Sequence, residues 1–461
     1  MNSPEPADDH LIAAALRSAS HTRVLVTKPG VRHETATVFR SQFGEQQPLI
    51  VADQHTFSVA GADVVASFSK QSIKTPPAKY IFGSHIYADD RCVAELQQAL
   101  QQSSAIPIAV GSGTINDLTK LAAHRLGRPY MAVATAASMD GYTAYGASIT
   151  ASGSKQTFDC PAPQAVLADL EVIAAAPTCM NASGYADLLA KIAAGADWIV
   201  ADALAIEPID PPVWATVQQR LRDWVGLPAA IATSDQAALH HLTSGLMMSG
   251  FAMQAAQTSR PASGADHQFS HLWDMQHHAV DGVPPSHGFK VGIGTLASVA
   301  LYEALLPQNF ESLDIDQAVR RWPTLEALLA QVASLFEPGE LAEKAILETQ
   351  AKYVTADQLR AQLATLRAAW PALRARLQAH LLPFAQLQSM LAAAGCPTQP
   401  EHIGISSSRL RHSYWQALFI RRRFTVLDLA HRAGLLDDCL DRLFSASGPW
   451  ARQQSSPTEQ A

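Results

Sequence analysis

Strand and helix patterns alternate along the first third of the chain. Continuous apolar runs predict strands, clearly over 48–52, 106–110 and 130–134 and more weakly over 64–68 and 80–82. A helix is predicted over 116–125, because Leu118, Leu121 and Ala122 share one helical face. Residues 148–172 predict a hairpin or loop that ends in an apolar run before Asp169. Strand, helix and strand joined by short turns are typical of a parallel α/β layer.

From about residue 177 onward the strand signals vanish and long helical patterns replace them. Leu359, Leu363 and Leu366 repeat at helical spacing, and a similar leucine pattern continues beyond Pro371. We therefore predict an α/β nucleotide-binding domain followed by an all-α domain, with a cleft between them. The expected boundaries are an N-terminal tail and helix over 1–20, the α/β domain over 21–177, the helical domain over 178–445 and a flexible tail over 446–461.

Composition narrows the class of protein. The 461 residues are 48% hydrophobic and only 16% charged, enough for a large core in two or three domains. A net charge of −7 without a Lys/Arg stripe argues against a nucleic-acid partner. The five cysteines form no CxxC pair, and the first residues lack a signal-peptide pattern. No apolar run is long enough for a membrane span. The scattered cysteines are typical of reduced thiols, so we expect a cytoplasmic protein.

A glycine-rich turn follows the strand that ends at Val110. Its sequence, Gly111-Ser112-Gly113-Thr114-Ile115, opens the predicted helix. Two glycines allow a phosphate close to the backbone, and amides at a helix start can hold it. The turn lacks the third glycine of the usual dinucleotide fingerprint, so a tight turn without a ligand is the alternative.

Polar residues at two other strand ends extend this candidate cofactor site. Thr135 and Ser138 follow the strand over 130–134, where ends of adjacent parallel strands line one crevice. Asp140 can accept from substrate hydroxyls or cap the following turn. Asp53 ends the strand over 48–52 and can accept from an adenosine ribose, which gives weak support for NAD over NADP.

Three histidines and an aspartate are candidates for a metal site. His267 and His271 are four residues apart and share one helical face, and His287 lies between Pro284-Pro285 and Gly288. Asp187 supplies a carboxylate at the start of an otherwise apolar helix. Imidazoles that converge with one carboxylate commonly bind a divalent metal. A solvated helix face with surface histidines is the alternative interpretation.

In their shared order, these motifs resemble the sn-glycerol-1-phosphate dehydrogenases of the iron-containing alcohol dehydrogenase and dehydroquinate synthase-like superfamily. The resemblance covers about residues 22 to 435. It rests on six segments: 111–117, 135–141, 186–191, 263–271, 287–292 and 419–428.

The resemblance implies a Rossmann-like N-terminal domain, an all-α C-terminal domain, NAD(P) and one divalent metal, whether zinc, iron or nickel. It implies Asp187, His267 and His287 as metal ligands, and it assigns catalytic and substrate contacts to Asp187, Asp140 and His271. The cofactor contacts that it implies are Gly111, Ser112, Gly113, Thr114, Ile115, Thr135, Ala136, Ala137 and Ser138. Two positions depart from the family: Asp266 stands where Glu is frequent, and Ala144 replaces a cofactor-contacting Ser. The chain also carries extra helical sequence around 300–400.

The expected reaction is reversible reduction of dihydroxyacetone phosphate to sn-glycerol 1-phosphate, in a homo-oligomer that we expect to be a dimer. The phosphate of this small substrate needs cations, and Lys191, Lys290 and the cluster Arg421–Arg423 are candidates. The alternative for each single one, which we favour, is a solvated or helix-capping cation. Three alternatives stay open: a glycerol or alcohol dehydrogenase with an uncharged substrate, a dehydroquinate synthase-like lyase, and a non-catalytic nucleotide- or metal-binding protein.

Overall fold

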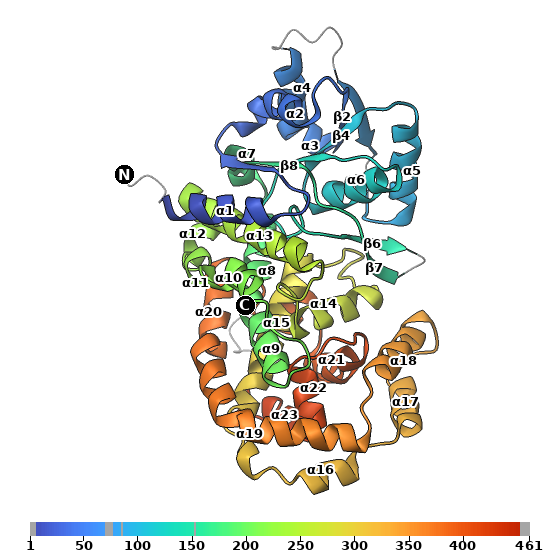
Figure 1. The fold of residues 1–461 in the computed structure, drawn as a ribbon, viewed down its shortest axis with the longest axis vertical. Coiled ribbons are helices and arrows are strands. Elements are labelled where there is room, and N and C mark those ends of the chain that lie inside the picture. The colour runs from blue at the N-terminus through green and yellow to red at the C-terminus, as the bar shows by residue number, and fades with distance from the viewer. Residues whose placement is uncertain (1–5, 70–76, 84–85, 152–153, 452–461) are drawn as a thin grey trace, which may run out of the picture.

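The computed structural model describes residues 6–69, 77–83, 86–151 and 154–451. The ends of both predicted tails, 1–5 and 452–461, lie outside this range. Figure 1 shows an α/β part above a part built of helices, with α1 (Pro6–Ser18) running along the junction. This confirms the predicted fold class, an α/β Rossmann-like part followed by helices. No helix in the described residues is long and apolar enough to cross a membrane.

Six parallel strands form the main sheet, in the order β1-β8-β5-β4-β2-β3. They are β1 (Val24–Lys28), β2 (Pro48–Asp53), β3 (Ala78–Phe82), β4 (Ile106–Gly111), β5 (Met131–Ala134) and β8 (Ala165–Asp169). A separate antiparallel hairpin joins β6 (Ala147–Ala151) to β7 (Ser154–Phe158). The strong strand predictions are confirmed, but the pattern analysis missed β1.

Helices cover both faces of the sheet. They are α2 (Thr35–Phe43), α3 (Gln54–Thr56), α4 (Ala62–Ser69), α5 (Asp90–Gln101), α6 (Gly113–Arg125) and α7 (Leu170–Ala175), with the short turns η1 (Val31–Glu34) and η2 (Phe57–Gly61). Alternate β2 residues point to opposite faces: Ile50 packs in one core cluster with Phe39 and Phe68, and Val51 in another with Leu118. Burial on both faces explains the unbroken apolar runs of the central strands.

The strand predicted over 64–68 is wrong, because these residues lie in helix α4. Val64 and Phe68 are four residues apart and both are fully buried against the sheet. That spacing places them on one helical face, so an apolar run of this length fits a helix as well as a strand. The helix predicted over 116–125 is confirmed and begins three residues earlier, at Gly113.

The rest of the described chain is helical. Its helices are α8 (Thr178–Leu189), α9 (Lys191–Ala203), α10 (Pro211–Gln218), α11 (Leu221–Trp224), α12 (Pro228–Ala232), α13 (Gln236–Ala256), α14 (Ala265–Met275), α15 (His287–Leu305), α16 (Ile315–Arg321), α17 (Leu325–Ser334), α18 (Glu340–Lys352), α19 (Ala356–His380), α20 (Phe384–Ala393), α21 (Ser407–Phe419), α22 (Val426–Arg432) and α23 (Leu436–Leu443), with the short turns η3 (Phe310–Ser312) and η4 (Pro400–Ile403). The extra sequence around 300–400 includes α16–α20, and its leucine repeat is one helix, α19, with Pro371 inside it.

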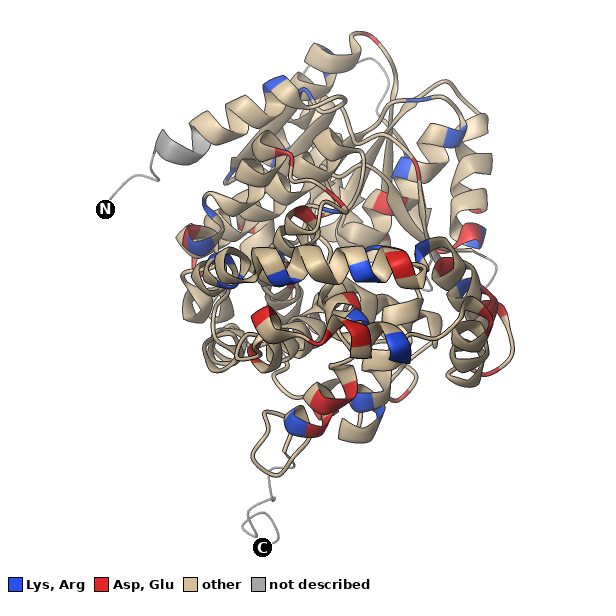
Figure 2. Ribbon diagram, turned by 60° about the horizontal axis from the view of Figure 1, so that its bottom comes forward, with Lys and Arg blue, Asp and Glu red and all other residues tan. Residues whose placement is uncertain are grey.

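Acidic and basic residues are interspersed over the described helices and strands, as Figure 2 shows. Three nearly unbroken apolar helices, α8, α13 and α15, pack at the centre of the helical part, with α8 in contact with both others. The first turns of α14 and α15 and the last turn of α8 therefore meet below the carboxyl ends of the sheet strands, where the candidate site lies.

Candidate active site

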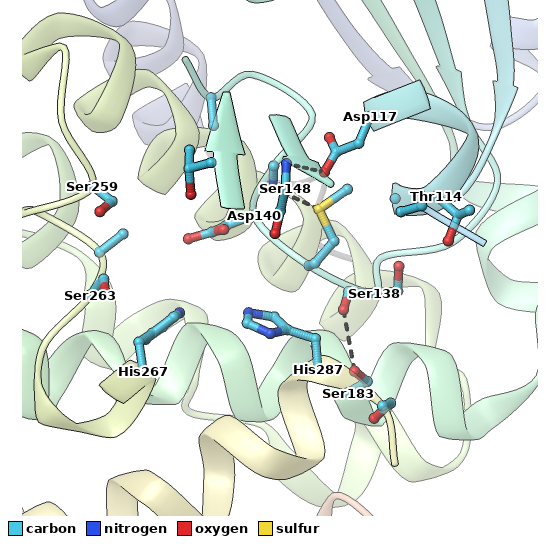
Figure 3. A pocket seen from close by; sticks show the side chains of 18 of the residues that line it. Thr114, Asp117, Ser138, Asp140, Ser148, Ser183, Ser259, Ser263, His267 and His287 are labelled. Carbon is cyan, nitrogen blue, oxygen red and sulfur yellow. Dashed lines mark hydrogen bonds between the residues drawn. The ribbon is translucent and has the colours of Figure 1, made fainter. Parts of the chain in front are cut away.

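A cavity of about 610 Å³ lies between the strand ends of the sheet and the helical part. Figure 3 shows Thr114, Ser138 and Asp140 on one side of it and His267 and His287 on the other. A second cavity of about 310 Å³ lies beside it, and Ser112 and Met180 line both. Two adjoining cavities at the carboxyl ends of parallel strands are the usual place for a dinucleotide and its substrate.

The glycine-rich turn joins β4 to α6 as predicted. A side chain at Gly111 would come within 2.6 Å of Cβ of Ile115, so the turn needs a residue without Cβ there. Ser112 is the N-cap of α6, and its side chain makes no capping hydrogen bond. Gly113 and Thr114 of this first turn line the cavity, and the start of a helix favours an anion electrostatically.

The other predicted cofactor residues divide into two groups. Ser138 lines the larger cavity, while Thr135 and Asp53 line the smaller one. Ile115, Ala136 and Ala137 are buried and line neither cavity. The amide of Ala137 donates to Asn181 instead, at 3.1 Å, so it holds the turn against α8.

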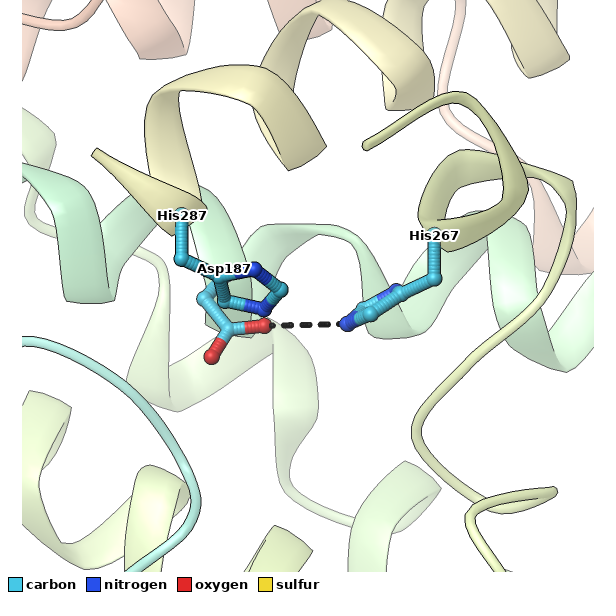
Figure 4. Close-up of side chains that lie close together, drawn as sticks. All are labelled: Asp187, His267 and His287. Atoms are coloured by element: carbon cyan, nitrogen blue, oxygen red, sulfur yellow. Dashed lines mark ion pairs between the residues drawn. The ribbon is translucent and has the colours of Figure 1, made fainter. Parts of the chain in front are cut away.

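Asp187, His267 and His287 converge from three helices, and their ligand atoms lie within 4.8 Å of one another (Figure 4). His267 Nε2 is 3.6 Å from Asp187 Oδ1, and the rings of His267 and His287 are 5.4 Å apart. Asp187 is in the last turn of α8, so the prediction that it starts a helix was wrong. After a short break the chain continues as α9, so the sequence of the two helices reads as one apolar segment.

A buried lysine balances the charge of Asp187. Lys191 Nζ lies 2.7 Å from Asp187 Oδ1 and 2.8 Å from Asp140 Oδ2. Burial opposes the charged form of Asp187, but Lys191 and the two histidines hold the pKa of its carboxyl well below the usual range. Asp140 also accepts from Ser249 at 2.8 Å, and its amide donates to Asp187 at 3.1 Å. Asp187 is therefore ionised and Asp140 is fixed beside it.

Asp266 orients His267. Its carboxylate hydrogen-bonds Nδ1 of His267 and accepts from the amide of Gly264 at 3.1 Å. Burial alone would lower the pKa of His267, but Asp266 and Asp187 raise it overall. A carboxylate on the far ring nitrogen aims Nε2 at the site, as is common for metal-bound histidines. Asp266, at the position where the resemblance implies a frequent Glu, thus contacts His267 directly.

A second buried carboxylate braces the same helix start and was not found from the sequence. Asp197 accepts from the amides of Ala265 and Val426 and from the hydroxyl of Tyr302, at 2.7, 2.8 and 2.6 Å. It thereby ties the first turn of α14, and with it His267, to α9, α15 and α22. Asp197 lies two residues after Gly195 in an apolar helix, a pattern that gives no sequence signal for this role.

His271 lies one turn beyond His267 and also lines the cavity. Its ring is 6.1 Å from that of His267 and 6.3 Å from that of His287. It is half-buried, whereas His267 is buried. His271 therefore lies beside the three converging side chains, where it can contact a molecule bound in the cavity.

The donor set fits a divalent metal. One ionised carboxylate and two imidazoles are ligands that zinc, ferrous iron and nickel all accept, and three protein ligands leave positions open for a substrate. His267 and His287 line the cavity, and Asp187 is fully buried beside them. A solvated helix face with surface histidines, the alternative interpretation, does not describe this arrangement.

Comparison with known proteins agrees with this geometry. A sequence model of the iron-containing alcohol dehydrogenase family matches residues 26–177. The chain is 34% identical over 304 residues to glycerol-1-phosphate dehydrogenase [NAD(P)+] from Bacillus velezensis, covering 63% of this chain and 76% of that one. It is 37% identical over 256 residues to the protein of that name from Halalkalibacterium halodurans, covering 55% of this chain and 64% of that one.

The fold is also found in solved structures. Glycerol dehydrogenase from Schizosaccharomyces pombe superposes with a TM-score of 0.59 at 18% identity, over 91% of this chain and 90% of that one. At this identity the likeness concerns the fold alone. The sequence relatives show the family: this chain belongs to the glycerol-1-phosphate dehydrogenases, within the iron-containing alcohol dehydrogenases.

Proposed function

We propose that this oxidoreductase reversibly reduces dihydroxyacetone phosphate to sn-glycerol 1-phosphate, with Asp187, His267 and His287 holding one divalent cation. The observation that carries the proposal is the convergence of these three side chains within 4.8 Å, because two of them, His267 and His287, line the cavity that the glycine-rich turn also lines. When bound, the cation supplies a Lewis acid for the substrate carbonyl and the nicotinamide supplies the hydride.

The chain's own residues position the reactants and handle the proton. Asp140 faces the cavity with its carboxylate fixed by Lys191 and Ser249, and it accepts a hydrogen bond from a substrate hydroxyl. His271 stands across the cavity and delivers the proton that the carbonyl oxygen needs after hydride transfer, directly or through one water. Lys191 does not line the cavity. It keeps Asp187 ionised and prevents repulsion between Asp187 and Asp140.

The test is NADH oxidation by enzyme that has been stripped with a chelator and reloaded separately with zinc, ferrous iron or nickel. Dihydroxyacetone phosphate and dihydroxyacetone are compared as substrates, and both enantiomers of glycerol phosphate are tried in the reverse direction. We expect activity only after reloading and with the phosphorylated substrate preferred. Turnover of dihydroxyacetone alone would assign a glycerol dehydrogenase instead.

The smaller cavity favours NAD over NADP. Asp53 and Glu171 place two carboxylates on its wall, next to Arg32. Arg32 bonds to Asp63 at 2.8 Å and to Asp169 and Glu171 at 2.9 Å each, so its charge is already matched by carboxylates. A 2′-phosphate in this cavity meets negative charge without a spare cation, whereas a ribose hydroxyl can donate to Asp53.

Replacing Asp53 with Asn tests this preference. Asp53 caps α3 by accepting from the Thr56 amide at 2.7 Å, and Asn can keep that cap. Loss of one negative charge should shift the ratio of kcat/KM for NADPH over NADH upward by about tenfold, the effect of roughly 1.4 kcal/mol. Asp235→Asn is the control, because Asp235 caps α13 in the same way and lines neither cavity. An unchanged ratio would mean that Asp53 does not face the ribose.

A further inference from the structure

Most cations near the active-site cavity are already engaged by the protein. Lys191 is held between Asp140 and Asp187, and Lys290 forms an ion pair with Asp274. Neither lysine lines the cavity. A phosphorylated substrate needs a positive partner within reach, because a phosphate group keeps its charge when it leaves water. The two lysine candidates do not meet this need.

The cluster Arg421–Arg423 lies in the segment between α21 and α22, and its three side chains have different surroundings. Arg422 is exposed and pairs with Glu348 at 2.9 Å. Arg423 donates to the carbonyl of Ser263 at 2.8 Å and to Ser259 Oγ at 3.1 Å. Arg423 therefore fixes the loop that precedes α14 and is not available to a ligand.

Arg421 is the member of the cluster that lines the cavity. Among the residues that the structure describes, no carboxylate lies within ion-pair distance of its guanidinium, and none accepts a hydrogen bond from it. Burial lowers the pKa of Arg421, only partly offset by the more distant Glu348 and Asp266. A desolvated guanidinium without a partner is costly, and an anion in the cavity would remove that cost.

Ser263 provides an independent sign of a ligand in the same cavity. It lines the cavity, the residue is 3% exposed, and within the described part of the chain its Oγ has no hydrogen-bond partner. Figure 3 places it with Ser259 on the side of the cavity where His267 lies. Buried hydroxyls are nearly always hydrogen-bonded, so this one points to a group absent from the chain itself.

We propose that Arg421 and Ser263 form the subsite for the phosphate group of the substrate. The inference rests on the proposed reduction of a phosphorylated ketone and names the residues that select it. Arg421 offers a planar fork of donors that matches a phosphate, and Ser263 adds a hydroxyl donor. Arg423 acts as a positioning residue, since its bond to the Ser263 carbonyl fixes the loop that carries this hydroxyl.

The subsite is tested with Arg421→Gln, Arg421→Lys and Ser263→Ala, and with Arg422→Gln as the matched control. Steady-state rates are measured with dihydroxyacetone phosphate and with dihydroxyacetone, and inorganic phosphate is titrated as a competitive inhibitor of both. Arg421→Gln should reduce kcat/KM for dihydroxyacetone phosphate by about 30-fold more than kcat/KM for dihydroxyacetone. For Arg421→Lys, the ratio of kcat/KM for the two substrates should lie between those of Arg421→Gln and the native protein. A lysine keeps the charge but not the planar fork of donors.

The control Arg422→Gln should keep the native ratio of the two substrates. Arg421→Gln should also weaken inhibition by inorganic phosphate by a similar factor. A native ratio and native phosphate inhibition in Arg421→Gln would overturn the subsite, even if dihydroxyacetone phosphate is the substrate. If the native protein reduces only dihydroxyacetone, the proposed function fails. Inhibition by inorganic phosphate then still tests the subsite. Loss of this inhibition in Arg421→Gln supports the assignment, and unchanged inhibition overturns it.

Discussion

His287→Ala should lose the bound cation and turnover together. The substitution leaves one carboxylate and one imidazole of the triad, too few to hold a divalent ion firmly in an open site. We expect kcat/KM to fall by at least about 1,000-fold, roughly 4 kcal/mol, because the carbonyl oxygen loses its electrostatic partner. Metal content measured by elemental analysis and NADH oxidation measured on the same sample provide the check.

The matched control is His412→Ala. His412 is exposed on α21 and does not line the cavity, so this variant should keep both cation and activity. Thermal unfolding of both variants distinguishes loss of the cation alone from unfolding of the whole protein. His287 is the first residue of α15 with Ser286 as its cap, so alanine there should not unfold the helix. Full activity with a full complement of cation in His287→Ala would remove this residue from the proposed site.

Much of this site could be predicted from the sequence because its signals are local. The spacing of His267 and His271 on α14 and the glycines between β4 and α6 are visible within a few residues. Asp187 is far in the sequence from the two histidines, so no local pattern shows that it lies beside them. The resemblance to a family implied this grouping. Asp187 and Lys191 are four residues apart, a spacing that fits the observed ion pair as well as the predicted role of Lys191 as a phosphate partner.

The predictions differ from the structure where one amino-acid pattern fits two structures and only burial distinguishes them. The run over 64–68 suits a strand until Val64 and Phe68 are seen packed on one face of α4. The short strand β1 was missed although it pairs with β8 along its length, because its five residues are only partly buried at the sheet edge. Arg421 lines the cavity, whereas its neighbour Arg422 is exposed and pairs with Glu348, a difference that no local pattern reveals.

Close helix contacts around the triad lead to a second large effect. A side chain on Gly288 would come within 1.8 Å of the carbonyl oxygen of Ser183, so α15 and α8 approach closely only because position 288 has no Cβ. The amide of Gly288 also donates to Ser183 Oγ at 3.1 Å. His287 precedes this glycine, and Asp187 lies one turn after Ser183. The glycine therefore sets the distance between two of the proposed metal ligands.

Gly288→Ala should accordingly damage both stability and activity. The backbone oxygen cannot turn aside, so the helices must separate, at a cost of about 3 kcal/mol. A displacement of about 1 Å between His287 and Asp187 should lower kcat/KM by about 100-fold. Gly292→Ala on the same helix is the control, because its Cβ would meet side chains and no backbone: the Ala186 methyl at 3.2 Å and Leu391 at 3.6 Å. Unfolding midpoints and NADH oxidation of the two variants give the comparison; equal behaviour would show that the helix approach does not position the triad.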